Sequence, residues 1–382
     1  MSEVLVVAGP GVVADPGLLA EVAEREFAAL GVRGELVHAR DPAHLRSLVI
    51  GGTVVLPGPS AEARDLIGRP LGPVVWVDIE RADGVTTGEG ATHLHGRGVG
   101  GLAWGIRHAV HRTRHPSRRV SYGPSPEQWG DLYVPAGAAH APVVALVHGG
   151  YWRSIWAADI MEPLCADLLG RGLAVWNLEY RRPDLHGWHA TTTDVAAGLA
   201  ALATPALQDA ATGGEAAPGG GAGAFGGDSP LDLRRVVVAG HSAGAQLALR
   251  AVADGARVAL AVSLAGVLDL VEGDRRWVSS GAVAAALGRR STQEADPGEE
   301  TAGVYAGASP LLRLPLGRRQ LIVQGAADDL DLVDFSRRYA RAAQEAGDDA
   351  EYLEMPGDHF AVITPSAPIW QATARAITAA LT

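Results

Sequence analysis

Short apolar runs that alternate with helix-like segments restrict the fold of this chain more than any other feature. In the first block the apolar runs occupy residues 5–8, 36–37, 54–56 and 74–77. Amphipathic patterns typical of helices occupy residues 18–30 and 101–115. Strands that are apolar on both faces belong to parallel sheets, whose crossover connections are helices. The first block therefore predicts a small α/β domain with a parallel sheet over residues 1–115.

The second block, residues 116–382, repeats this alternation over a longer stretch. Strands are expected at residues 143–148, 173–180, 235–240, 258–264, 321–324 and 351–355. Helices are expected near residues 159–169, 193–203, 243–253, 335–346 and 369–381. Two segments interrupt the pattern: a Gly- and Ala-rich stretch at 212–230, predicted to be a flexible surface loop, and residues 269–311, predicted to be a cap. The joint between the blocks lies at His115-Pro116, because the residue before a proline disfavours helix.

Composition excludes several classes of function. The sequence contains no lysine, so its 32 basic residues are all arginine, which excludes Schiff-base lysines and lysine-dependent phosphate loops. A formal net charge of −11 argues against a nucleic-acid partner. A single cysteine, Cys165, can form neither an internal disulfide nor a thiolate metal cluster. Because no apolar stretch approaches the ~20 residues of a membrane span and no basic leader precedes the first apolar run, we expect a soluble, cytoplasmic protein without a membrane partner.

Residues 240–244 carry the first sign of chemistry. They read Gly-His-Ser-Ala-Gly between an apolar strand and a helix-like run, the context in which a G-x-S-x-G turn exposes a nucleophilic serine. A serine hydroxyl needs a base and an orienting carboxylate, expected in the chain order Ser, acid, His. His359 is the only histidine after Ser242 and is therefore the predicted base. The acid should follow the penultimate strand, where Asp328 is preferred and Asp329 is the alternative.

The segment 148–152, His-Gly-Gly-Tyr-Trp, follows another predicted strand and is placed to offer backbone N–H groups to an oxyanion. The residues whose N–H groups are predicted to form the oxyanion hole are Gly149, Gly150, Tyr151 and Ala243. A small aromatic substrate would suit the aromatic residues nearby, and the residues expected to contact it are Trp152, Trp156 and His241. Arg181, Arg275 and Arg276 are either partners for a substrate carboxylate or solvated surface arginines. The predicted chemistry needs no metal ion and no organic cofactor.

These motifs make residues 120–382 similar to α/β-hydrolases. The segment 148–152 matches the H-G-G-x-W signature of kynurenine formamidases (arylformamidases) and their carboxylesterase relatives, and segments 240–248, 264–270, 308–310 and 358–360 also match. The resemblance implies a serine hydrolase that cleaves a formamide or ester of an aromatic substrate through an acyl-enzyme. It also supports Asp328 over Asp329 through the spacing to Ser336. A carboxylesterase acting on small aryl or short-acyl esters is the alternative, and a non-catalytic pseudo-hydrolase that only binds a ligand is the alternative of another class.

The first block resembles type II 3-dehydroquinate dehydratase in segments 5–11, 54–58 and 95–102, which implies a flavodoxin-like fold. Its catalytic parts are missing. The first 70 residues contain no tyrosine, and residues 77–80 read Val-Asp-Ile-Glu where that family carries His-Leu-Ser-Asn. We therefore expect a degenerate domain that has kept the sheet and lost the dehydratase chemistry. Its role is to cover the pocket, to supply a contact for a homo-oligomer, or to contribute a residue to substrate binding.

Overall fold

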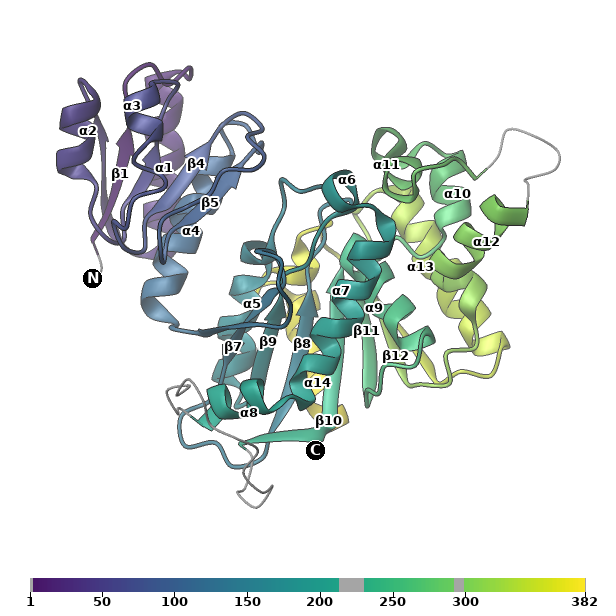
Figure 1. The fold of residues 1–382 in the computed structure, drawn as a ribbon. Coiled ribbons are helices and arrows are strands. Elements are labelled where there is room, and N and C mark those ends of the chain that lie inside the picture. The colour runs from purple at the N-terminus through teal and green to yellow at the C-terminus, as the bar shows by residue number, and fades with distance from the viewer. Residues whose placement is uncertain (1–2, 213–229, 292–298, 382) are drawn as a thin grey trace. The chain divides into compact units, whose positions relative to one another are not determined.

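The chain divides into two compact units, each with its own sheet and hydrophobic core (Figure 1). Unit 1 is Met1–Pro116 and unit 2 is Ser117–Thr382. The structure, a computed structural model, describes residues 3–212, 230–291 and 299–381. Over these residues, no helix combines the length and the apolar character that crossing a bilayer would require.

Unit 1 is built on a five-stranded sheet in the order β2-β1-β3-β4-β5, and every strand pair is parallel. The strands are β1 (Glu3–Ala8), β2 (Arg33–His38), β3 (Val54–Leu56), β4 (Val75–Asp78) and β5 (Thr92–His95). The helices are α1 (Pro16–Leu30), α2 (Pro42–Leu48), α3 (Ala61–Arg64) and α4 (Gly101–Arg114). This confirms the parallel-sheet fold predicted for the first block, while β5, α2 and α3 were not predicted.

Local sequence explains the limits of α1 and how the sheet of unit 1 is covered. Asp15 caps the helix by accepting a hydrogen bond from the N–H of Leu18 at 2.8 Å, and Pro16 occupies the first turn, where a missing N–H costs nothing. The helix ends at Gly31, which adopts a left-handed conformation with φ of 60°. Side chains of α1 and α4 pack in one core, and side chains of α2 and α3 pack in the other, so both faces of the sheet are covered.

Unit 2 is built on an eight-stranded sheet in the order β13-β12-β11-β10-β8-β9-β7-β6. The pairs that β7 forms with β6 and β9 are antiparallel, and the other described pairs of this sheet are parallel. The strands are β6 (Arg118–Ser121), β7 (Trp129–Tyr133), β8 (Ala141–Val147), β9 (Ala174–Leu178), β10 (Leu231–His241), β11 (Leu260–Leu264), β12 (Gln320–Gly325) and β13 (Ala350–Met355). The α-helices are α5 (Glu162–Gly170), α6 (Pro183–His186), α7 (Trp188–Ala200), α8 (Pro205–Thr212), α9 (Ala243–Ala253), α10 (Leu270–Arg275), α11 (Val278–Leu287), α12 (Glu299–Ala308), α13 (Leu330–Glu345) and α14 (Pro368–Leu381).

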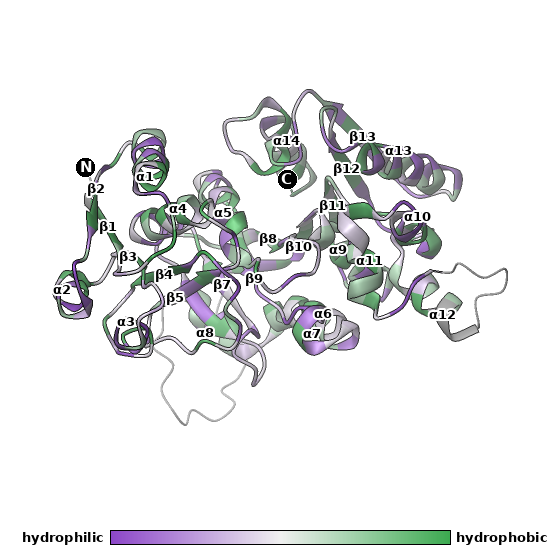
Figure 2. Cartoon of the chain, turned by 90° about the horizontal axis from the view of Figure 1, so that it is seen from above, coloured by the Kyte–Doolittle hydropathy of each residue, from purple (hydrophilic) through white to green (hydrophobic). Residues whose placement is uncertain are grey.

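Helices cover both faces of this sheet, as an α/β-hydrolase fold requires. In Figure 2, α5 and α14 lie on one side of the strands and α7 and α9 on the other, and the indole N–H of Trp370 in α14 donates to Asp167 in α5 at 2.8 Å. In the same figure, strands β1 and β3 of unit 1 are coloured hydrophobic. Helix α13 of unit 2 carries hydrophobic and hydrophilic residues on different faces. At one edge of the sheet, β13 pairs only with β12.

Three segments differ from the expectations or lie beyond them. The β6–β7 hairpin was not predicted, because its short strands contain no continuous apolar run. Arg119 holds it together by a two-point ion pair with Asp131 and by stacking over Trp129 at 3.4 Å. Residues 213–229 of the predicted Gly-rich loop are outside the described residues. The cap segment 269–311 contains α10, α11 and α12.

Candidate active site

Ser242 lies at a sharp turn between β10 and α9. Its backbone has φ of 55° and ψ of −121°, a conformation that L-residues rarely adopt and that the nucleophile elbow of α/β-hydrolases requires. The glycines on either side make the turn possible. A Cβ at Gly240 would lie 2.2 Å from the carbonyl oxygen of Gly244, and a Cβ at Gly244 would lie 2.2 Å from that of Val147. The G-x-S-x-G pattern is therefore explained by backbone crowding at both glycine positions.

The Ser242 side chain is buried and has not formed a hydrogen bond. Its backbone N–H donates to the carbonyl of Leu264 at 2.8 Å, which ties the elbow to the end of β11. Its Oγ has no hydrogen-bond partner among the described residues, and the residue is 1% exposed. The hydroxyl is thus not joined to the imidazole of His359 in this structure. Catalytic hydrogen bonds of this kind are often loose before substrate binds.

His359 and Asp328 meet beside this elbow, although 31 residues separate them. The Nδ1 of His359 donates to Oδ2 of Asp328 at 2.9 Å, and the Asp328 side chain is only 3% exposed. Gln324 donates to the same oxygen at 2.9 Å, and Ser336 in turn donates to Gln324 at 2.8 Å. These contacts orient the carboxylate toward the imidazole.

The alternative acid, Asp329, has a different contact. Its carboxylate accepts a hydrogen bond from the N–H of Asp331 at 2.8 Å and caps α13. The N–H of Asp329 itself donates to Oδ1 of Asp328 at 2.7 Å. Asp328 is therefore the carboxylate that contacts His359, and Asp329 has a local structural contact.

His241 connects the elbow to the loop that carries His359. Its Nε2 donates to the carbonyl of His359 at 3.1 Å, and the two rings lie 4.7 Å apart. Burial, and then the neighbouring His359, lower the pKa of His241 well below its usual range, so the ring is neutral. The His359 ring also contacts Phe360 edge-on at 5.6 Å. His241, predicted to contact substrate, is 2% exposed and its Nε2 is used in holding this loop.

The turn at 149–151 passes directly beside Ser242. A Cβ at Gly149 would lie 2.8 Å from Cβ of Ser242 and 2.6 Å from the carbonyl oxygen of His241, so only glycine fits there. Gly150 has φ of 114° and Tyr151 has φ of 49°, which keeps the turn tight. Over the described part of the chain, no acceptor pairs with the backbone N–H groups predicted for the oxyanion hole, those of Gly149, Gly150, Tyr151 and Ala243.

The carbonyl groups of this turn are fixed by buried side chains. Tyr180 donates from its hydroxyl to the carbonyl of His148 at 2.7 Å, and Nδ1 of His148 donates to the carbonyl of Gly149 at 2.8 Å. In a planar trans peptide the N–H points opposite to the C=O. The N–H groups of Gly149 and Gly150 are therefore turned away from His148 and Tyr180. This arrangement orients two of the predicted oxyanion donors before any substrate arrives.

Glu179 completes the polar cluster beneath the turn. Its carboxylate accepts from Nε2 of His148 at 3.2 Å, from the N–H of Ala158 at 2.9 Å and from Arg182. Burial alone would raise the pKa of Glu179, but Arg182 and His148 outweigh burial and lower it to about 2. Tyr180 stacks on His148 with ring centroids 4.4 Å apart. The Glu179 carboxylate is thus ionised and is held by donors from several segments.

The two tryptophans predicted to contact substrate have different environments. Trp152 has φ of 57°, its indole N–H donates to Gln246 at 3.0 Å, and it is 2% exposed, so it forms part of the core behind the turn. Trp156 is half-buried and packs against Gly150, where a Cβ would lie 2.3 Å from the Cβ of Trp156. The substrate contacts expected of Trp152 and Trp156 stay predictions.

The three arginines considered as partners for a substrate carboxylate already have carboxylate partners. Arg181 forms a two-point pair with Asp194, at 2.8 Å for each bond. Arg275 and Arg276 both pair with Glu272, and Arg276 also pairs with Asp331 at 2.9 Å. In the described residues, no group of three or more His, Cys, Asp or Glu side chains is arranged to hold a metal ion.

Several supporting residues escaped the sequence analysis, namely Glu179, Tyr180, Gln324 and Ser336. Glu179, Tyr180 and Gln324 are polar residues at or just beyond the end of a buried strand, at the sheet edge that carries Ser242. That position is the one available signal, because side chains at the carboxyl ends of parallel strands line the active-site edge.

Known proteins resemble unit 2. A family model described as alpha/beta hydrolase fold matches residues 144–364, and no curated protein matches the chain. A bacterial heroin esterase is 20% identical with a TM-score of 0.52, covering 69% of this chain and 83% of its own. Carboxyl esterase 2 of the mycorrhizal fungus Tuber melanosporum is 18% identical with a TM-score of 0.53, covering 70% and 88%. A truncated carbohydrate esterase from gut microbiota is 19% identical with a TM-score of 0.55, covering 69% and 94%. At these identities the similarity concerns the fold alone.

Proposed function

The chain belongs to the alpha/beta hydrolase fold family, and from this premise we propose that unit 2 is a serine hydrolase that works through an acyl-enzyme. Its proposed catalytic residues are Ser242, Asp328 and His359. The observation that carries the proposal is the 2.9 Å contact between Asp328 and His359 beside the strained Ser242 turn. The unpaired N–H groups of the neighbouring turn support it, because acyl transfer needs donors for a developing oxyanion.

The first half of the reaction acylates the enzyme. Ser242 Oγ attacks the carbonyl carbon of the substrate while Nε2 of His359, the nitrogen that Asp328 leaves free, takes the hydroxyl proton. The negative charge that develops on the carbonyl oxygen is stabilised by backbone N–H groups of Gly149, Gly150, Tyr151 and Ala243. His359 then returns the proton to the leaving amine or alcohol as the bond to the carbonyl carbon breaks.

The second half releases the acid. A water molecule gives a proton to His359 as its oxygen attacks the acyl carbon, and the same N–H groups stabilise the second tetrahedral intermediate. The intermediate collapses, Ser242 recovers its proton from His359, and the acid departs. Asp328 stays ionised throughout and holds the imidazole in the orientation both halves need.

We propose an aromatic formamide or ester as the substrate class. Apolar side chains border the catalytic residues: Phe360, adjacent to His359, is 44% exposed, and Leu330, which follows Asp329, is 80% exposed. Burial, and then Asp329 and Asp328, raise the pKa of Tyr151 to about 12, so its hydroxyl is a neutral donor at the turn. The resemblance of residues 148–152 to kynurenine formamidases favours an N-formyl aryl amine such as N-formylkynurenine over a simple ester.

A two-substrate assay tests the proposal. kcat/KM is measured on an N-formyl aniline and on p-nitrophenyl acetate, with Ser242→Ala as the control. Removing the nucleophile should lower kcat by about 10⁶-fold. Formamide turnover supports the formamidase assignment. Ester turnover without formamide cleavage selects the carboxylesterase alternative.

A fluorophosphonate probe separates catalysis from mere binding. The wild-type chain should be labelled at Ser242, and Ser242→Ala should not be. A wild-type chain that stays unlabelled and inactive on both substrates would identify a non-catalytic, ligand-binding pseudo-hydrolase and would overturn the proposal.

For unit 1 we propose a degenerate relative of type II 3-dehydroquinate dehydratase without dehydratase activity. Residues 77–80 read Val-Asp-Ile-Glu where that family carries His-Leu-Ser-Asn. The full-length chain should not dehydrate 3-dehydroquinate, and measurable turnover would refute the assignment.

A further inference from the structure

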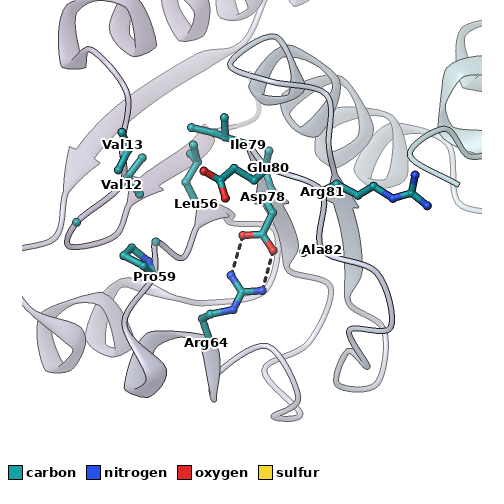
Figure 3. A pocket seen from close by; sticks show the side chains of 13 residues that line it. Val12, Val13, Leu56, Pro59, Arg64, Asp78, Ile79, Glu80, Arg81 and Ala82 are labelled. Carbon is teal, nitrogen blue, oxygen red and sulfur yellow. Dashed lines mark hydrogen bonds and ion pairs between the residues drawn. The ribbon is translucent and has the colours of Figure 1, made fainter. Parts of the chain in front are cut away.

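Unit 1 contains a cavity of about 360 Å³ at the carboxyl ends of β1, β3 and β4 (Figure 3). β2 and β3 pair on opposite sides of β1, so the order of strands reverses at β1 and β3. The loops after these two strands lead to α1 and α3, whose side chains belong to cores on opposite faces of the sheet. In open parallel sheets a crevice opens at such a reversal, and ligands bind there. The volume is within the ~300–1,000 Å³ usual for small-molecule sites.

Apolar side chains and glycine backbone form the walls of this cavity. Val12, Leu56, Pro59 and Ile79 line it, and Val13, at its edge, is 87% exposed. Figure 3 shows Val12 and Val13 on one side and Pro59 and Arg64 below the opening.

The floor of the cavity contains an ion pair that is already satisfied. Arg64 donates to both carboxylate oxygens of Asp78 at 2.9 Å each, and Nε2 of His93 contacts the same carboxylate at 2.8 Å. Burial would raise the pKa of Asp78, but the hydrogen bonds from His93 and Arg64 outweigh it and hold the pKa well below its usual range. The charges of Arg64 and Asp78 therefore compensate each other.

Glu80 brings a charge into the cavity that is not compensated. In Figure 3 its carboxylate is turned into the opening, whereas the Arg81 side chain points away, and Nε of Arg81 pairs with Asp83 at 2.6 Å. Among the described residues, no side chain or backbone N–H pairs with the Glu80 carboxylate. The cavity thus presents an acceptor with a formal negative charge next to apolar walls.

Anionic ligands are disfavoured at this site. The N-terminus of α1, which would otherwise attract an anion, already holds the carboxylate of Asp15. The guanidinium of Arg64 is engaged by Asp78, so neither feature is free to bind a phosphate or a carboxylate. Glu80 would add repulsion.

We propose that this cavity binds a small organic cation, an amine carried on an apolar or aromatic body. The ammonium group donates to Glu80, and the apolar body packs against Val12, Leu56 and Ile79. Val77-Asp78-Ile79-Glu80 is the segment in which the sequence departs from the dehydratase family, so the proposed ligand class differs from the chemistry of that family.

Matched probes test the charge preference. Tyramine and 4-hydroxyphenylacetate share a phenol and differ in the sign of the charge on the side chain. Binding to the full-length Ser242→Ala chain is titrated by NMR, which prevents turnover in unit 2 and reports on the amides of unit 1. Tyramine should bind saturably, shift the amides of residues 11–13 and 79–82, and bind at least about tenfold more tightly than the acid.

Two glutamate variants locate the interaction. Glu80→Gln keeps the shape of an exposed side chain and should weaken tyramine binding by about five- to tenfold. Glu89→Gln, which removes another exposed carboxylate of unit 1 outside the cavity, should leave the affinity unchanged. Equal affinity for the two probes, an unchanged affinity of Glu80→Gln, or no saturable tyramine binding would overturn the proposal. None of these outcomes depends on whether unit 2 is a hydrolase.

Discussion

Replacing Tyr180 by Phe tests whether the Tyr180 hydroxyl orients the predicted oxyanion donors by holding the His148 carbonyl. The change removes one oxygen and keeps the ring that stacks on His148 at 4.4 Å. It deletes the 2.7 Å hydrogen bond to the His148 carbonyl, which shares a peptide plane with the N–H of Gly149. The next peptide, between Gly149 and Gly150, keeps its own contact from Nδ1 of His148 to the carbonyl of Gly149. The donor is therefore loosened, not removed.

The size of the effect follows from the hydrogen bond that is lost. Tyr180 is fully buried, and leaving a buried carbonyl without a donor costs about 1–3 kcal/mol of folding free energy. The net contribution of such a hydrogen bond to stability is about 0.5–1.5 kcal/mol. If all of it were lost from the transition state, the rate would fall by a factor of about 2–12. We expect kcat to fall about two- to tenfold and KM to change less than about twofold, because the ground-state carbonyl is not yet an oxyanion.

The assay is steady-state hydrolysis of p-nitrophenyl acetate, with active sites counted by fluorophosphonate labelling. Tyr339→Phe is the matched control. Tyr339 is also fully buried in unit 2, and its hydroxyl donates to Gln320 at 2.7 Å, at the start of β12 and away from the elbow. Both variants should lose similar stability in denaturant titrations, but only Tyr180→Phe should lose kcat.

Two results would refute this reasoning. Equal losses of kcat in the two variants would mean that the rate follows general stability. A Tyr180→Phe variant that is less stable and yet has an unchanged kcat would mean that the His148 carbonyl does not orient the donor.

Three further outcomes are expected. Gly149→Ala should lower kcat by about 100-fold or more, because its Cβ would lie 2.6 Å from the His241 carbonyl oxygen. Gly170→Ala is the control: a Cβ has open space there, and this variant should keep full activity in the same assay. Asp328→Asn should lower kcat by about 10⁴-fold. Asp329→Asn should leave kcat nearly unchanged and keep the cap of α13, because asparagine also accepts at a helix N-terminus; a larger rate effect at Asp329 would reverse the assignment of the acid. Burial, and then neighbouring histidines, lower the pKa of His111 in α4 to about 3 from 6.5. As the pH falls, the unfolded chain therefore binds a proton at His111 before the folded chain does. Unit 1 should lose stability below pH 6.5, by about 2 kcal/mol at pH 5. Hydrogen exchange of the α4 amides measures this, and increased protection in acid would contradict it.

Much of the fold is readable from the sequence because buried parallel strands leave a strong pattern. Strands such as β8 and β12 are continuous apolar runs, and each strand predicted from such a run is present in the structure. β5, Thr-His-Leu-His, has no such pattern, since its polar side chains are satisfied by partners elsewhere in unit 1, as His93 is by Asp78. The β6–β7 hairpin likewise depends on a cross-strand pair that only the folded chain reveals.

The candidate site also has a part that the sequence predicts and a part that it does not. Ser242, Asp328 and His359 follow ends of predicted strands, and the common edge of a parallel sheet explains why they come together. The support beneath the oxyanion turn was not predictable, because Glu179 and Tyr180 meet His148 across 31 and 32 residues and no local pattern encodes that pairing. Trp152 has a positive φ and is buried in the core, two features that residue type alone does not indicate.

The position of β13 makes the segment that carries His359, the proposed catalytic base, easier to unfold than the rest of unit 2. The strand that leads to His359 is the outermost of the sheet, bonded to β12 alone, and most of its side chains are only partly buried. Peripheral strands detach at lower free energy than the centre of a domain. Mild heat or dilute denaturant should therefore abolish the proposed hydrolase activity reversibly, under conditions in which the circular dichroism spectrum is unchanged.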